Sequence, residues 1–170
     1  MIHIHPAVPA DVPLIRALVQ ELAEYEREPQ SVLITEEQLL RDGFSENSAE
    51  RYFECLIAEF DTKDGRQPAG FALFFPIYST WRGRSLHLED LFVRPAFRGH
   101  GIGKSLLQHI ASIAIDRGCA RLQWDVLEWN KPAIDFYRSL DATMLEEWRR
   151  MRVTDDALAK IAAAEARVEA

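Results

Sequence analysis

The sequence predicts an α/β protein with a mixed central β-sheet and helices on both faces. Two apolar segments, residues 53–60 and 69–78, flank a polar turn and predict a β-hairpin. Residues 85–94 are apolar on both alternating faces, which is typical of a central strand that is covered on both sides. A helical pattern at 102–117 follows that strand and leads to another apolar segment at 121–127, which predicts a crossover connection.

The composition favours one folded domain spanning residues 1–170. The chain has 48% hydrophobic and 28% charged residues, which argues against disorder. Its net charge of −7 argues against nucleic-acid or anionic-membrane partners and is compatible with a cationic amine as partner. The N-terminus has no signal-peptide pattern, and no apolar run approaches a membrane span. Two distant cysteines, Cys55 and Cys119, predict free thiols and therefore a reducing, cytoplasmic location.

The N-terminal segment predicts one strand and two helices. Residues 2–5 alternate as in a strand, where His3 and His5 share a face without the further His or Cys needed for a metal site, so no metal is expected. Asp11 is placed to cap a helix whose apolar residues recur at helical spacing up to Tyr25. The pattern Thr35-Glu36-Glu37-Gln38 is a capping box for a shorter helix.

The C-terminal segment predicts alternating helices and strands. Gly118 ends the helix that begins at residue 102, and Asn130 caps a helix after the strand at 121–127. Residues 143–153 predict a last strand, so a parallel strand pair should lie near the middle of the sheet. The alanine-rich segment 154–170 predicts a C-terminal helix or a frayed tail.

A glycine-punctuated loop lies between the strand at 85–94 and the following helix. It reads Arg98-Gly99-His100-Gly101-Ile102-Gly103, and a strand, a glycine loop and a helix N-terminus in this order predict a phosphate site. A nucleoside-triphosphate loop would need a glycine at Arg98, and a dinucleotide fingerprint would need one at Lys104. The pattern R-x-x-G-x-G fits Arg98, Gly101 and Gly103.

At this loop the chain resembles the GNAT N-acetyltransferases, which bind the pyrophosphate of acetyl-CoA with such a motif. A second signature of that family, N-x-x-A-x-x-F-Y, is matched by residues 130–137. Stretches such as LHLEDLFV and VLEWNKPAIDFYRSL resemble the diamine (spermidine/spermine) and thialysine acetyltransferase branch. The resemblance implies a GNAT-like mixed sheet, acetyl-CoA as acetyl donor, a small primary amine as acceptor, and a homodimer.

An acetyl transfer from a thioester to an amine requires two proton transfers. A lysine-like amine has a pKa of about 10.4 and must lose a proton, whereas the leaving thiolate gains from receiving one. Glu89, on the strand before the loop, is the candidate base, and Tyr137 is the candidate acid. Asp90 should face the opposite side of a regular strand unless a β-bulge brings both acids to one cleft.

The resemblance implies further site residues. Those expected to bind the cofactor are Phe92, Val93, Arg98, Gly99, His100, Gly101, Ile102, Gly103, Lys104, Asn130 and Tyr137. Those expected to bind the substrate are Glu26, Glu28, Trp81, Glu89, Asp90, Glu147 and Trp148. Ser79 stands where polyamine enzymes tend to carry an acid, which favours thialysine-like amino acids or short diamines over long polyamines.

Other functions remain open at this stage. An acetyltransferase for protein or peptide amines would carry the same cofactor motifs. A CoA-binding sensor without turnover would keep the loop and would not depend on Glu89 or Tyr137. A phosphate-loop NTPase is disfavoured by Arg98.

Overall fold

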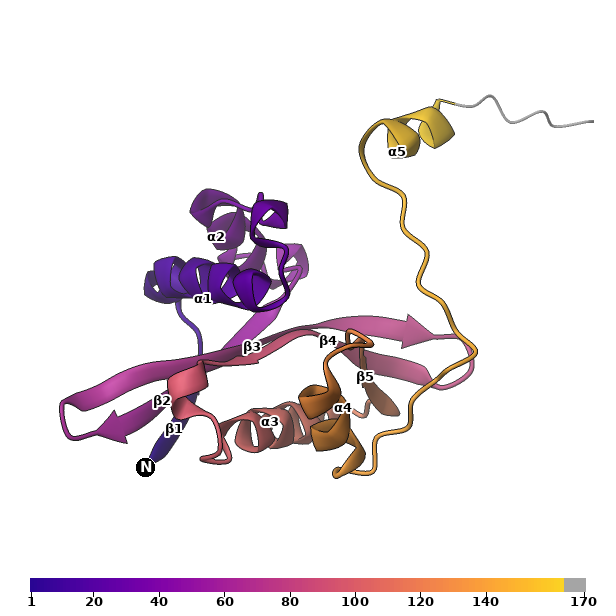
Figure 1. Cartoon of the computed structure of the whole chain (residues 1–170). Coiled ribbons are helices and arrows are strands. Elements are labelled where there is room, and N and C mark those ends of the chain that lie inside the picture. The colour runs from indigo at the N-terminus through magenta and orange to yellow at the C-terminus, as the bar shows by residue number, and fades with distance from the viewer. Residues whose placement is uncertain (164–170) are drawn as a thin grey trace, which may run out of the picture. The chain divides into compact units, whose positions relative to one another are not determined.

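The computed structural model describes residues 1–163, which fold into two compact units (Figure 1). The first unit, Met1–Asp125, holds β1 (Ile2–Pro6), α1 (Val12–Tyr25), α2 (Glu36–Phe44), β2 (Glu54–Thr62), β3 (Gly65–Ser79), β4 (Gly83–Val93), α3 (Ile102–Asp116) and β5 (Arg121–Trp124). The second, Val126–Ala170, holds α4 (Lys131–Arg138) and α5 (Asp155–Ala162). The prediction of a single folding domain stays a prediction. Across the described residues, no helix has the length and apolarity to cross a bilayer.

The first unit is built on one mixed sheet with the strand order β1-β2-β3-β4-β5. Neighbouring strands from β1 to β4 pair antiparallel, and β4 pairs with β5 in parallel. The predicted mixed sheet is therefore confirmed. The expected position of the parallel pair near the middle is wrong, because the described residues contain no sixth strand and the pair lies at the edge.

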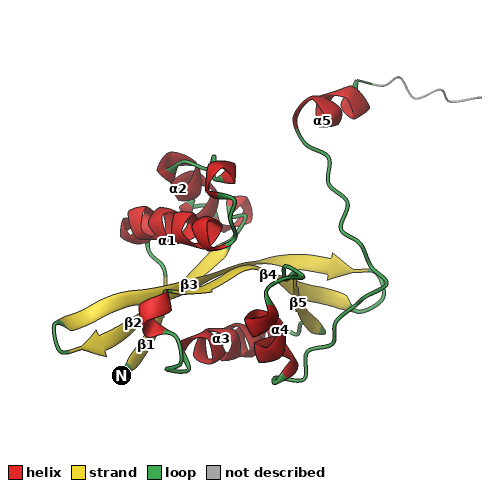
Figure 2. Ribbon diagram, viewed as in Figure 1, coloured by secondary structure: helices red, strands yellow, loops and turns green. Residues whose placement is uncertain are grey.

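Helices cover both faces of this sheet, as predicted (Figure 2). On one face, here called the α1 face, Ile15 and Leu18 of α1 pack with Phe71 of β3 and Phe92 of β4. On the opposite α3 face, the apolar stripe of α3 is buried. Its fully buried members are Ile102, Leu106 and Ile110. Removing each such side chain from water stabilises the fold by about 1.5–3 kcal/mol.

Two predicted helix caps have different outcomes. The Thr35 capping box is confirmed, since its Oγ1 accepts from the Gln38 N–H at 3.2 Å and Gln38 Oε1 accepts from the Thr35 N–H at 2.9 Å. Asp11 precedes α1, but its carboxylate accepts the Val8 N–H at 2.8 Å and makes no cap bond to α1. A single-turn 3-10 segment at Pro9–Asp11 directs that carboxylate backward, so the predicted cap is wrong.

In the second unit, the predicted cap of α4 is confirmed, and a predicted strand does not form. Asn130 caps α4 as predicted, accepting the Ala133 N–H at 3.3 Å. Residues 143–153 form no strand, because a strand's N–H and C=O groups need a neighbouring chain and none pairs with this segment in the described residues. The predicted C-terminal helix is confirmed as α5, and residues 164–170 lie outside the described residues.

Candidate active site

A β-bulge in β4 determines where the two adjacent acids point. Asp90 lies opposite Leu73 of β3, and Leu88 lies opposite Phe74, so Glu89 is an extra residue without a partner. Such an insertion reverses the alternation of side chains at that point. The bulge that could bring the two acids together is therefore present in the strand.

Both acids lie on the α1 face. Leu73, the cross-strand neighbour of Asp90, belongs to the core of that face. His87 lies opposite Phe75, which packs against the same core, and Glu89 Oε2 is 3.3 Å from His87 Nε2. Two carboxylates thus share a surface on which a regular strand would have placed only one.

These acids are part of a larger group, called here the acidic patch: Glu26, Glu89, Asp90 and Asp125. Burial, together with the charges of Glu89 and Glu26, raises the pKa of Asp90 to about 7. Burial also raises the pKa of Glu26, which follows the last residue of α1. Because burial disfavours the charged forms of Glu26 and Asp90, a bound cation such as an ammonium group would stabilise the patch.

The glycine loop builds an anion site at the start of α3. Gly99 and Gly101 have φ angles of +81° and +82°, and the space that a Cβ would occupy at each is open. The first turn of α3 contains no acid, and Lys104 is exposed there. Helix N-termini leave N–H groups without internal partners, so Gly101 to Lys104 suit the diphosphate of acetyl-CoA.

Arg98 shapes the loop from the inside. Its Nε donates to the Val93 carbonyl oxygen at 2.9 Å, and its guanidinium lies 4.7 Å from the centre of the Tyr25 ring. His100 also faces the protein, with its ring 4.8 Å from that of Phe60. These contacts indicate that both side chains hold the loop in shape and that its backbone and Lys104 offer the groups for a ligand.

The second half of β4 has an open edge. β5 pairs with β4 only from Ser85 to Leu88, so no strand of the described residues borders Val93 on that side. The Arg94 N–H bonds to the Ala69 oxygen of β3. By alternation, the backbone of Phe92 also faces β3 while that of Val93 faces the open edge. This favours Val93 over Phe92 for pairing with an extended ligand.

In the second unit, Tyr137 lies near the end of α4 with its ring centre 5.1 Å from that of Phe136. Burial raises the pKa of Tyr137 to about 12. The phenol therefore keeps its proton at neutral pH and can serve as a proton donor. Asn130 makes the capping bond of the same helix.

Two other expected substrate residues of the first unit, Glu28 and Trp81, are not drawn into the patch. Glu28 instead accepts hydrogen bonds from Gln30 Nε2 and Ser31 Oγ, which close the turn after α1. Trp81 is 81% exposed at the β3–β4 turn, roughly 20 Å along β4 from Glu89. Glu147 and Trp148 are exposed in the segment without regular structure.

Sequence reasoning missed three residues around the site. His87 is buried beside Glu89, and Asp125 Oδ2 lies 3.9 Å from the same His87 nitrogen. Arg94 joins the end of β4 to Glu21 of α1 through Nη2, at 2.6 Å. The sequence could have pointed to His87, because a histidine two residues before a candidate base can contact it. The partners of Arg94 and Asp125 follow only from the fold.

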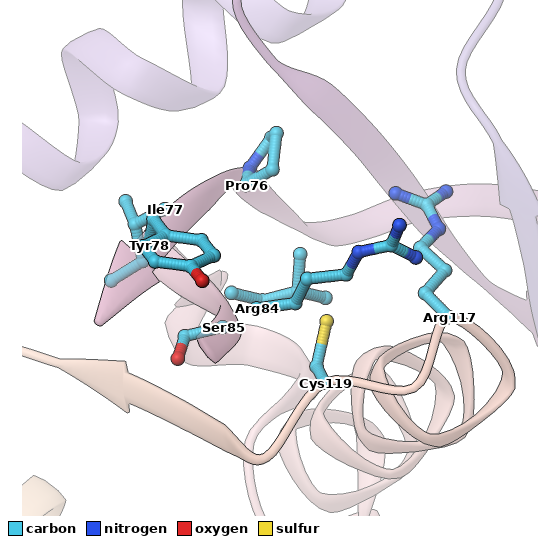
Figure 3. Close-up of a pocket in the computed structure, with 8 residues that line it drawn as sticks. Pro76, Ile77, Tyr78, Arg84, Ser85, Arg117 and Cys119 are labelled. Carbon is cyan, nitrogen blue, oxygen red and sulfur yellow. The ribbon is translucent and has the colours of Figure 1, made fainter. Parts of the chain in front are cut away.

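A cavity lies elsewhere in the first unit (Figure 3). It measures about 540 Å³ and is lined by Tyr78 of β3, Arg84 of β4, and Arg117 and Cys119 beyond the C-terminal end of α3. α3 has 15 residues, so its two ends are about 22 Å apart. This cavity is therefore separate from the anion site at the start of the helix.

An anion site at the start of α3 and a cation-attracting patch around the bulge of β4 suit an enzyme that joins an anionic donor to a cationic acceptor. The family model described as "Acetyltransferase (GNAT) family" matches residues 15–141. The chain belongs to this family and is an N-acetyltransferase. Members of the family use acetyl-CoA as the acetyl donor.

Known relatives agree with this assignment. The chain is 40% identical to thialysine N-epsilon-acetyltransferase of Sus scrofa over 166 residues, covering 94% of this chain and 96% of that protein. It is 41% identical to the Caenorhabditis elegans protein of the same name, covering 86% and 88%. An integron cassette protein from V. cholerae superimposes with a TM-score of 0.74 at 26% identity, covering 96% and 98%.

Asp90→Asn should stabilise the protein at pH 8. A raised pKa means that the folded state holds a proton which the unfolded state, near 3.8, has lost, so stability falls as the pH rises from about 4 to about 7. Asparagine removes this penalty, and the expected gain is roughly 1–3 kcal/mol at pH 8 and near zero at pH 4. Urea unfolding at both pH values measures it.

Asp61→Asn is the control, because His3 lowers the pKa of that exposed carboxyl. This variant should lose stability at pH 8. An Asp90→Asn variant that is destabilised at pH 8 would contradict the account of the patch.

Gly101→Ala should weaken CoA binding by about tenfold, roughly 1.4 kcal/mol. The added methyl group enters the open space beside the helix start and also strains a backbone with positive φ. Gly118→Ala is a matched control, since Gly118 has a φ of +66° and open space at the other end of α3. Calorimetric titration with CoA should detect a loss for Gly101→Ala alone, and equal losses would argue against the site.

Proposed function

We propose that this N-acetyltransferase moves the acetyl group of acetyl-CoA to a primary amine of a small diamine, polyamine or lysine-like amino acid. The observation that carries the proposal is the bulge at Glu89. It gathers the acids on the strand whose end leads into the anion site. The acceptor's charge and the donor's charge therefore have separate binding regions on one element.

The spacing along β4 suits a direct transfer. Glu89 and Val93 are four residues apart, about 13 Å in a strand. A donor held by its diphosphate at the start of α3, with its arm along the open edge at Val93, would carry its thioester toward the acidic patch. Positioning of this kind supplies much of the rate for an acyl group that is already reactive.

Glu89 and Tyr137 carry the proton transfers in this proposal. The ammonium of the substrate loses a proton to the Glu89 carboxylate, and the free amine attacks the thioester carbon. The carbon–sulfur bond breaks, and the phenol of Tyr137 gives its proton to the sulfur. The nitrogen of the new amide loses its second proton to water, and water returns a proton to the Tyr137 phenolate. The phenol carries its proton before the transfer, since burial raises the pKa of Tyr137 to about 12.

The relatives support a small amine as acceptor. Besides the thialysine acetyltransferases, similar proteins include spermidine/spermine N(1)-acetyltransferase-like protein 1 of Homo sapiens and L-ornithine N5-acetyltransferase of Arabidopsis thaliana. Glu26 and Asp90 are suited to a second ammonium group. Ser79 offers no carboxylate, and its Oγ accepts the Trp81 N–H within the turn, which favours short acceptors.

Tyr137→Phe should lower kcat about 10²-fold and leave CoA affinity unchanged, since only the proton donor is lost. The measurement is release of the CoA thiol from acetyl-CoA across diamines, polyamines, lysine analogues and a peptide. Tyr78→Phe is the matched control, because Tyr78 carries an exposed phenol on β3. Failure of every free amine to release thiol would refute the proposal, and a preference for the peptide would replace the small acceptor with a protein.

We also propose that the enzyme is a homodimer in which a second copy covers the C-terminal arm, defined as residues 143–162. The arm exposes several large apolar side chains, which mark an association surface rather than a solvated tail. They are Leu145, Trp148, Met151, Leu158 and Ile161. In this proposal Glu147 and Trp148 reach a substrate only within the assembled dimer.

Sedimentation should give a particle of twice the 19.5 kDa chain. Replacing Trp148, Met151 and Leu158 with serine should yield a monomer at micromolar concentration, because the apolar contact area is lost. Leu33→Ser is the control, since Leu33 is an exposed leucine of the first unit. A monomeric wild-type protein would rule the dimer out.

A cytoplasmic location is a further proposal. It is supported by the free thiols of Cys55 and Cys119, because disulfides are typical of proteins in oxidising compartments. Cell fractionation would contradict it by recovering the protein with secreted or organellar material.

A further inference from the structure

His87 of β4 is a buried polar side chain to which the proposed reaction gives no task. The residue is 7% exposed, and its ring lies 5.2 Å from that of Phe75 on β3, tilted by 32°. Its backbone pairs with Phe75 on one side and with Gln123 of β5 on the other. The imidazole is therefore held between two strands and has little freedom to turn.

The position of one nitrogen indicates a function. Nε2 lies 3.3 Å from Glu89 Oε2 and 3.9 Å from Asp125 Oδ2, so it stands between two carboxylates. A buried imidazole in this place supplies a donor where the surrounding acids supply only acceptors. Glu89 itself sits in a bulge, which does not hold its side chain as firmly as a paired strand position would.

A proton relay through His87 is the less suitable explanation. The Glu89 side chain is 45% exposed and can pass its proton to water directly, whereas that of His87 is 9% exposed. A relay is useful when the base is cut off from solvent, and here the base is the more exposed group. The geometry is that of a second residue orienting a catalytic one.

We propose that His87 is a positioning residue for Glu89: its Nε2–H donates to Oε2 and directs Oε1 toward the amine of the substrate. Asp125 holds the imidazole from the other side. The inference rests on the proposed function, because it assigns Glu89 as the base.

The charged groups around Glu89 explain why such a donor is needed. Asp90 on the same strand, Asp125 after β5 and Glu26 at the end of α1 are all acidic. These neighbours offer the Glu89 carboxylate no hydrogen-bond donor. A hydrogen bond donated by His87 supplies one and fixes the direction of the carboxylate.

His87→Phe and His87→Gln form the test. Phenylalanine keeps a ring against Phe75 and removes the donor, whereas the amide of glutamine returns an N–H near the place of Nε2. The first variant should lower kcat/KM for the amine about 10- to 100-fold at pH 7 and move the acid limb of the pH profile upward by about one unit. The second should restore most of both. KM for acetyl-CoA should stay unchanged in each, because the donor binds at the loop.

A structural role alone would not give this result. It would lower activity equally in both variants and leave the acid limb of the pH profile in place. That outcome would overturn the role of His87. The activity of Glu89→Gln is a separate test of the proposed function. Nitrogen-15 NMR of the histidines gives a measurement without turnover. Glu89→Gln should move the pH midpoint of the His87 signal downward, since a neighbouring carboxylate is lost, and an unmoved midpoint would also overturn it.

Discussion

One inserted residue in β4 decides the chemistry of this protein. A regular strand would send Glu89 and Asp90 to opposite faces, one beneath α1 and one beneath α3. With Glu89 unpaired opposite β3, both carboxylates lie on the α1 face with Glu26 nearby. Burial, together with the charges of Glu89 and Glu26, raises the pKa of Asp90 to about 7, so a bound cation would stabilise this surface. The fold therefore bears an electrostatic cost at this site that a bound ligand relieves.

The donor site is built by a different physical means. The start of α3 presents unpaired amides, two glycines leave the approach open, and Lys104 is exposed in the first turn. The side chain of Arg98 is used inside the loop, against Val93 and Tyr25. Recognition of the anion is thus mostly a property of backbone geometry, and recognition of the amine is a property of side-chain charge.

Local sequence patterns were sufficient to predict several helices and their caps. The capping box at Thr35, the cap at Asn130 and the helix after the glycine loop depend on residues within a few positions of one another, and each formed as expected. The positions of Glu28 and Trp81 relative to the acidic patch could not be predicted from local patterns. A turn determines the neighbours of Glu28, and the length of a hairpin determines those of Trp81. The strand expected at residues 143–153 does not form, for a related reason. Alternation of apolar residues indicates a preference for strand structure, but a strand also needs a neighbouring strand to pair with, which the local sequence does not reveal.

The C-terminal end of α1 serves both halves of the site. Tyr25 supports the guanidinium of Arg98, and the next residue, Glu26, acts on Asp90. If an amine that binds beside Glu26 shifts this helix end, Tyr25 and the Arg98 side chain of the donor loop would shift with it. Such linkage is reciprocal, so the factor by which one substrate changes the affinity of the other is the same in either order of addition. The two substrates would then bind cooperatively, with a single turn of helix as the coupling element.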